Sequence, residues 1–271
     1  MTDTAAATPA PVPGTGGPVA AQDAGMLSAS EKTLIVLEAA MTHDRFSEIV
    51  AAAGLPKATV HRILATLVDR EFVVVSDGGY VPGPRVLSLA GLAYERVDIS
   101  RLVQPYIDDL VERVHCTVHV GTRSGDEMVY LVRTDSDKPY RMPSRVGASI
   151  PLHTSAIGKS ILAEDDDDAI DRLVARAGLP RRTARSITTI EDLKRELADV
   201  RERGFAFDRE ENVPGVVCIG APIRDHTGHT NYGLSISSLA LEHTEEQLVA
   251  MSGDLLRTAS AVTHALGGTP R

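Results

Sequence analysis

The chain has 271 residues, enough for two ordinary domains, and a net charge of −9. No apolar run approaches the roughly 18 residues of a membrane-spanning helix, and the N-terminus lacks the basic start and apolar core of a signal peptide. Two cysteines, Cys116 and Cys218, do not make a disulfide framework. We therefore expect a cytoplasmic protein that makes no contact with a membrane.

Residues 1–25 are mainly Ala, Pro, Thr and Gly, with almost no charge or bulk. Such a segment cannot bury enough apolar surface to offset the entropy lost on ordering. We predict a disordered tail over residues 1–25.

Two short amphipathic patterns meet at Gly54-Leu55-Pro56. Apolar residues recur at helical spacing in both, first at Phe46, Ile49, Val50 and Ala53 and then at Val60, Ile63, Leu64 and Leu67. Gly54 can adopt the left-handed conformation that ends a helix, and Pro56 suits the first position of the next helix. The pattern predicts a helix-turn-helix, whose second helix can enter a DNA major groove.

The outer face of that second helix carries the candidate DNA-binding residues. Ala58 and Arg62 lie opposite the apolar stripe, His61 lies on its flank, and Lys57 and Thr59 fall in the first turn. Small residues permit close approach to a groove, and Arg62 can reach guanine or phosphate. Lys57, Thr59 and the free N–H groups of the first turn suit phosphate. A helical hairpin within a bundle, with a solvated basic face, is the alternative.

The flanking segments favour the DNA-binding interpretation. Ser28 and Glu31 form a potential capping box before a helix that carries Leu34, Leu37 and Met41. After Leu67, the segments FVVV, SDGG and YVP are typical of a β-hairpin with an Asp-Gly turn. This order predicts a winged helix-turn-helix domain over residues 26–92.

The predicted DNA-binding domain is close to electrically neutral. Residues 26–92 contain six basic and seven acidic residues, and most of the negative charge lies C-terminal to them. Because phosphate neutralisation dominates non-specific affinity, we expect modest affinity for each domain and two or more domains bound at each site.

The rest of the chain is predicted to be a linker helix over residues 93–104 and an α+β domain over residues 105–271. Pro105 is expected to start or kink a helix that continues to Val114. From Thr117 onward, β-rich segments alternate with helical ones, as in TVHVGTR, EMVYLVRT, GVVCIGAPIRD and YGLSISSL. A helical connector between two domains is a natural place for two chains to meet.

Several motifs of this chain resemble the isocitrate lyase regulator (IclR) family of bacterial transcription factors. They are GLPKATVHRILATL with YVPGPRVLSLA, VGASIPLHTSAIGKSILA, and GFAFDREENVPGVVCIGAPIRD with YGLSISS, in the family's order over about residues 28–266. The resemblance implies a winged helix, a linker helix and a GAF-like C-terminal domain that binds a small metabolite. It also implies homodimers or homotetramers on palindromic double-stranded DNA operators.

The same resemblance implies an effector site at Ala156, Ile157, Asp208, Cys218, Ser235 and Ser237. Independently of it, serines two apart in a strand place both hydroxyls on one face, and a helix that begins near Ser155 favours an anion at its start. Ile157 is bulkier than the small residues of some glyoxylate-responsive relatives, which argues against a two-carbon acid. We therefore expect a repressor of a catabolic operon that senses a small organic acid, with no cofactor.

Other chemistries fit the sequence less well. Cys218 is a potential nucleophile, but the apolar run VVCIGA is more typical of a pocket wall or core. His115-Cys116-x-x-His119 and His226-x-x-His229 lack the paired ligand sets of a zinc site, so no metal is expected. Asp165 to Asp168 are more typical of a helix cap than of a cation site. An enzyme that kept a DNA-binding-like hairpin, or a dimerising scaffold, remains the alternative to a regulator.

Overall fold

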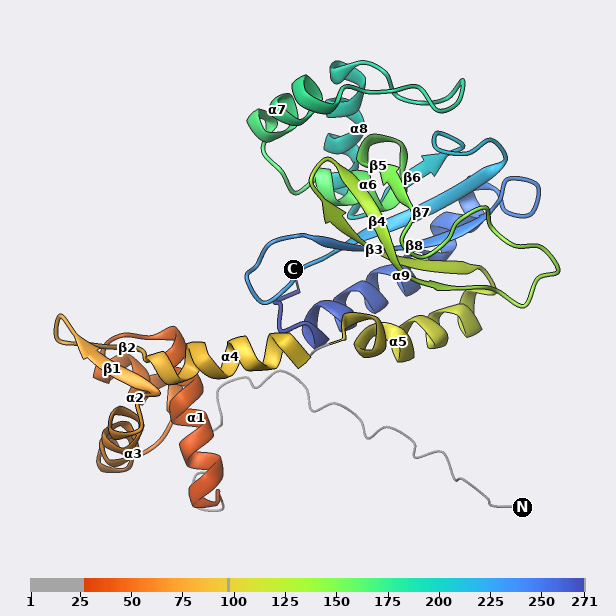
Figure 1. The fold of residues 1–271 in the computed structure, drawn as a ribbon. Helices are drawn as coiled ribbons and strands as arrows, with labels where there is room; N and C mark the ends of the chain where they lie inside the picture. Colours follow the sequence, from red (N-terminus) through yellow and green to blue (C-terminus); the bar gives the residue numbers. More distant parts are fainter. Residues whose placement is uncertain (1–26, 97, 271) are drawn as a thin grey trace, which may run out of the picture. The chain divides into compact units, whose positions relative to one another are not determined.

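The computed structural model describes residues 27–96 and 98–270 (Figure 1). The predicted tail over residues 1–25 lies outside the described residues. The chain divides into two compact units, Met1–Val97 and Asp98–Arg271. Each unit has its own apolar core.

The N-terminal unit has the predicted helix-turn-helix followed by a two-stranded wing. Its elements in chain order are α1 (Ala29–Thr42), α2 (Phe46–Ala53), α3 (Lys57–Asp69), β1 (Val73–Ser76), β2 (Gly79–Pro82) and α4 (Pro84–Arg96). Ser28 and Glu31 make the predicted capping box, and Gly54 ends α2 at φ 61°. Asp77 and Gly78 both have positive φ, as the tight turn between β1 and β2 requires.

Two details of this unit differ from the sequence prediction. Pro56 precedes α3 as its N-cap instead of occupying its first helical position. Helix α1 buries Val36, Ala39 and Ala40, whereas Leu34 is 58% exposed. The small alanine side chains let α1 pack closely on the neighbouring helices, while Leu37 and Met41 are half-buried against the same core.

The C-terminal unit is an α+β domain built on one antiparallel sheet. Its strands are β3 (Thr117–Ser124), β4 (Glu127–Thr134), β5 (Ser149–Pro151), β6 (Ala206–Arg209), β7 (Val216–Ile223) and β8 (Tyr232–Leu239). They lie in the order β5-β4-β3-β8-β7-β6. Its helices are α5 (Ile99–Val114), the 3₁₀ turn η1 (Leu152–Thr154), α6 (Ala156–Leu162), α7 (Asp167–Ala177), α8 (Ile190–Arg203) and α9 (Glu245–Ala265).

Alternation along the strands gives this sheet two different faces. On one face, Ile236 of β8 lies opposite Val118 of β3 and Ile219 of β7. These three side chains pack against apolar residues of α5 and α9. His119, Cys218 and Ser237 project from the opposite face. That second face is covered by α6, beyond which lie α7 and α8 (Figure 1).

The linker helix predicted over residues 93–104 is divided between two helices in the structure. Helix α4 ends at Arg96 and α5 starts at Ile99, because the Asp98 carboxylate caps α5 by accepting from the N–H groups of Ser100 and Arg101. Pro105 lies inside α5 and does not start it. The short edge strands β5 and β6 were not predicted, whereas the predicted acidic cap is confirmed, since Asp166 accepts from the Ala169 N–H at the start of α7.

Candidate functional sites

The outer face of α3 is open to solvent. Val60, Ile63, Leu64 and Leu67 are all buried, which leaves Lys57, Ala58, His61 and Arg62 exposed and Thr59 half-buried. The His61 ring lies edge-on to Phe46 of α2, with ring centroids 6.2 Å apart. The five residues assigned to DNA by the sequence therefore share one accessible surface of a helix whose other side is fixed in the core.

The C-terminal unit contains a cavity of about 360 Å³ on the α6 side of the sheet. Asp208, Cys218 and Ser237 line it, and they come from the three neighbouring strands β6, β7 and β8. His119 of β3 and Tyr130 of β4 complete this wall, and residues 142–145 of the segment between β4 and β5 close it from another side.

His119 connects the wall of the cavity to that closing segment. Its Nε2 lies 2.7 Å from the Ser144 hydroxyl and its Nδ1 lies 3.3 Å from the Ser237 hydroxyl. Its ring stacks on Tyr130 at a centroid distance of 4.7 Å. Burial, together with the nearby Arg133 guanidinium, lowers the pKa of His119 to about 3, so the ring is neutral at pH 7 and orients hydroxyl groups without adding charge.

Asp208 brings an acceptor into the same wall. Its Oδ1 accepts the N–H groups of Glu211, at 2.7 Å, and Asn212, at 3.3 Å. Within the described part of the chain its Oδ2 has no hydrogen bond. Burial and then the Glu211 carboxylate raise the pKa of Asp208 to about 7, so near neutral pH this carboxyl group exists in both protonation states.

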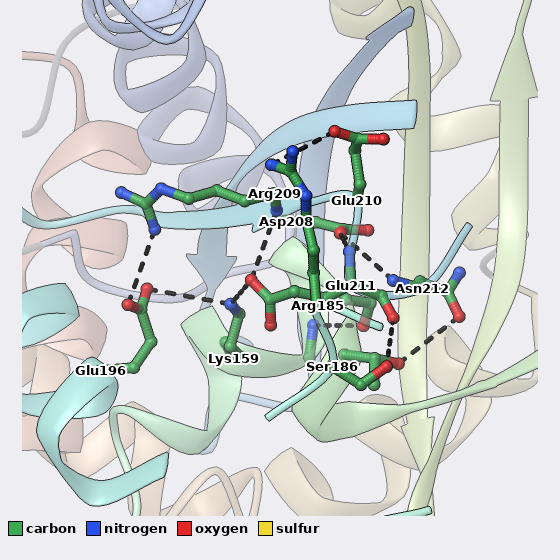
Figure 2. Close-up of polar contacts among 12 residues, drawn as sticks. Lys159, Arg185, Ser186, Glu196, Asp208, Arg209, Glu210, Glu211 and Asn212 are labelled. Atoms are coloured by element: carbon green, nitrogen blue, oxygen red, sulfur yellow. Dashed lines mark hydrogen bonds and ion pairs between the residues drawn. The ribbon is translucent and has the colours of Figure 1, made fainter. Parts of the chain in front are cut away.

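Behind Asp208 lies a buried ion pair, shown in Figure 2. Lys159 of α6 is fully buried and contacts the Glu211 carboxylate, while Glu196 of α8 lies 3.8 Å from the same ammonium. Ser186 donates to the Glu211 carbonyl at 2.7 Å. The network holds the turn that follows β6 and thereby fixes the position of Asp208.

Cys218 and Tyr130 supply the less polar part of the wall. Burial raises the pKa of the Cys218 thiol, which keeps it protonated and unreactive as a nucleophile at neutral pH. Burial also raises the pKa of Tyr130, and its hydroxyl has no hydrogen bond to another described residue. Cys218 thus gives the cavity an uncharged thiol wall, and Tyr130 offers a donor to a molecule that enters it.

Two arginines stand at the exposed edge of the cavity. Arg145 and Arg182 line it, and both side chains are exposed. Across residues 27–96 and 98–270, neither guanidinium is in a salt bridge. These arginines were not predicted as site residues, since they lie in irregular segments outside the motifs. His119 and Tyr130 were not predicted as part of the site either, because their place in the wall depends on strand pairing.

The other predicted effector residues lie elsewhere. Ala156 and Ile157 are buried where α6 crosses the strands, and a Cβ atom at Gly220 would lie only 2.6 Å from the Ala156 carbonyl carbon. Ser235 is the register partner of Gly220 under that crossing. In the described structure these three residues are not part of the cavity lining, and the Gly158 N–H at the start of α6 is bound by the Ser155 hydroxyl.

The described residues contain no cluster of three or more His, Cys, Asp or Glu side chains that could hold a metal ion. Within the same residues, no helix combines the length and apolarity that a membrane crossing requires. Both cysteines are free and buried.

Comparison with known proteins agrees with this architecture. Residues 30–77 match the IclR helix-turn-helix domain and residues 92–264 match the bacterial transcriptional regulator IclR C-terminal domain. The HTH-type transcriptional regulator BhcR of Paracoccus denitrificans is 30% identical over 95% of this chain and 93% of its own length. KdgR of Escherichia coli is 34% identical over 79% and 84%.

Solved structures lead to the same family. The crystal structure of Thermotoga maritima IclR superposes with a TM-score of 0.61 at 30% identity and covers 88% of this chain and 98% of that one. The Agobacterium tumefaciens repressor BlcR gives a TM-score of 0.70 at 26% identity over 91% and 99%. The family comprises transcriptional regulators, so the expectation of a regulator and not an enzyme is confirmed. This chain belongs to the IclR family of bacterial transcriptional regulators.

Proposed function

We propose that this regulator is a repressor that binds operator DNA through α3 and responds to a small organic acid held in the cavity of the C-terminal unit. Lys57, Ala58, Thr59, His61 and Arg62 form the DNA-contacting face. The curated relatives include proteins named as repressors, such as the transcriptional repressor IclR of Escherichia coli, which supports repression.

The effector proposal rests on one observation, which is that the same cavity has cationic groups at its exposed edge and a carboxyl group in its buried wall. The unpaired guanidinium groups of Arg145 and Arg182 stand at the exposed edge, and the Asp208 carboxyl group lies in the buried wall. Guanidinium groups bind carboxylates through charge-assisted hydrogen bonds. The buried wall instead offers Asp208 Oδ2, the Tyr130 hydroxyl and Ser237, which suit a hydroxyl group.

The effector is therefore a carboxylic acid with a hydroxyl group at its other end. Its carboxylate lies against Arg145 and Arg182, and its hydroxyl group lies against Asp208. This orientation differs from the one expected from the sequence, in which the start of α6 held the carboxylate.

A thermal-shift comparison of pentanoate, 5-hydroxypentanoate and 1,5-pentanediol tests the orientation, because a ligand that binds only the folded state raises the melting temperature. We expect 5-hydroxypentanoate to give the largest shift of the three. Equal shifts of the melting temperature with pentanoate and 5-hydroxypentanoate would show that Asp208 does not bind a hydroxyl group of the ligand.

The arginine contacts are tested by substitution with a matched control. Arg145→Ala/Arg182→Ala should weaken acid binding by roughly 100-fold or more, since each of the two lost hydrogen bonds to a charged group contributes about 1.5–3 kcal/mol. Arg181→Ala is the control, because that neighbouring side chain is exposed but does not line the cavity. Unchanged acid affinity in the double variant would place the carboxylate elsewhere.

We also propose that the protein binds DNA as a homodimer or homotetramer. A near-neutral DNA-binding domain supports this, because one such domain has few cations with which to hold a duplex. Footprinting should show two half-sites about 10 bp, or a multiple of that, apart. Protection of one unrepeated half-site by a monomer would contradict the proposal.

A further inference from the structure

A groove runs between the start of α1 and one flank of α3. Its walls are Ala29, Lys32 and Thr33 from α1 and Thr59, Arg62, Ile63 and Thr66 from α3. The groove has a volume of about 330 Å³. It lies beside the exposed face of α3, on the opposite flank from the Phe46–His61 ring contact.

The two cations of this groove are not held in ion pairs in the described part of the chain, although the Glu31 carboxylate attracts Lys32 through space. Within the described residues neither Lys32 nor Arg62 takes part in a salt bridge. Glu31 is the nearest acid in sequence, but its carboxylate accepts from the Ser28 N–H at 2.7 Å and so is committed to the capping box. Two of the six basic residues of the near-neutral segment 26–92 thus meet at one place.

Two of the three threonine hydroxyl groups in the groove donate hydrogen bonds to other described residues, and the third does not. Thr33 donates to the Ala29 carbonyl and Thr66 donates to the Arg62 carbonyl. The Thr59 hydroxyl has no hydrogen bond to any other described residue. Thr59 therefore adds a free donor to a groove that two cations also line, a combination that suits a phosphate oxygen.

We propose that Lys32, Thr59 and Arg62 form a binding site for a backbone phosphate of DNA, with Lys32 as a contact outside the helix-turn-helix itself. This inference rests on the proposed binding of DNA through α3. When α3 lies in a major groove, the sugar-phosphate strands run along its two flanks. The α1 side of the helix then meets one strand. Lys32 holds that strand and reads no base, so its contribution is electrostatic and independent of sequence.

The test uses the full-length protein and two duplexes of equal length, one selected by the protein from random DNA and one scrambled. Lys32→Gln should weaken binding to both duplexes by the same factor. It should also make the slope of log K against log salt concentration shallower by about 0.9 for each bound protomer, since one phosphate contact is lost. Lys32→Arg should keep the slope of the parent.

Two further variants separate the effect of the Lys32 charge on DNA affinity from other effects of substitution in this domain. Thr59→Val should weaken both duplexes without changing the salt slope, because it removes a hydrogen bond and no charge. Arg70→Gln is the matched control, since Arg70 caps the far end of α3 and is paired with Asp69. It should leave both affinities and the slope unchanged.

Circular dichroism establishes that each variant is folded before its affinity is interpreted. A folded Lys32→Gln protein with the salt slope of the parent would overturn the proposal. So would a loss confined to the selected duplex, because that result would make Lys32 a base-reading residue and not a phosphate ligand.

Discussion

Lys159 Nζ lies 2.5 Å from Glu211 Oε1 in the interior of the C-terminal unit, where both side chains are almost completely withdrawn from solvent. The second oxygen, Glu211 Oε2, is buried and has no hydrogen-bond partner among the described residues. The pair also lies directly behind the cavity, since the Glu211 N–H donates to Asp208. It links the stability of the domain to the shape of its candidate effector site.

Breaking this pair from one side should be costly. Lys159→Met leaves the Glu211 carboxylate buried and without its main partner, which typically destabilises a protein by about 3–5 kcal/mol. Adding Glu211→Gln removes the stranded charge, so the double variant should be more stable than Lys159→Met alone. Urea denaturation measures the free energy of unfolding of each variant. A double variant that loses as much stability as the two single variants added together would contradict this account.

Asp208 should make stability depend on pH with an unusual sign. Its folded pKa of about 7 lies above the ordinary value, so between roughly pH 4 and pH 7 the native state holds a proton that the unfolded state has lost. Stability from this group therefore falls as pH rises through that window. His119, with its folded pKa lowered to about 3, acts in the opposite direction below pH 6.5.

The two effects are separated by comparing the parent with Asp208→Asn. The stability of the parent relative to the variant should decrease as pH rises from 4.5 to 7, at most by about 1.4 kcal/mol for each pH unit. Urea denaturation at several pH values measures this difference. A constant difference across the window would mean that Asp208 titrates near its ordinary pKa.

Gly220 should tolerate no side chain. A Cβ atom there would lie 2.6 Å from the Ala156 carbonyl carbon and 2.7 Å from the Ile157 backbone nitrogen. Gly220→Ala must push α6 off the sheet, with a cost of about 1–3 kcal/mol in thermal or urea denaturation. Gly91→Ala is the control, because that Cβ meets nothing within 4 Å on an exposed part of α4 and should stabilise by up to about 1 kcal/mol. Equal effects would contradict the close packing of α6.

Arg62 should contribute to DNA affinity directly. Its side chain is exposed on α3, opposite the buried Val60 and Leu64. Because Arg62 belongs to the proposed phosphate site, Arg62→Ala should weaken binding to the selected and the scrambled duplex by a similar factor, worth roughly 1–3 kcal/mol. A titration by fluorescence anisotropy measures this loss. Unchanged affinity in a folded variant would place the DNA on another surface.

Local sequence was sufficient for the elements whose signals lie within a few residues. Some backbone conformations are adopted readily by only a few residue types, so those residues reveal them in the sequence. Examples are the capping box at Ser28, the left-handed Gly54 and the Asp77-Gly78 turn. The winged helix could therefore be predicted in chain order. The break between α4 and α5 could have been predicted in the same way from Asp98, an N-cap residue that the helical periodicity around it obscured.

Tertiary structure alone decided which residues share the cavity. His119, Asp208 and Ser237 meet because β3, β8, β7 and β6 are neighbours in the sheet, although β3 is far from the other three strands in the chain. The sequence placed Ser235 and Ser237 on one face but could not show that α6 covers Ser235 and leaves Ser237 at the cavity. That division depends on Gly220, which lets the α6 backbone approach one part of the sheet while the buried Lys159–Glu211 pair holds Asp208 beside the part left open.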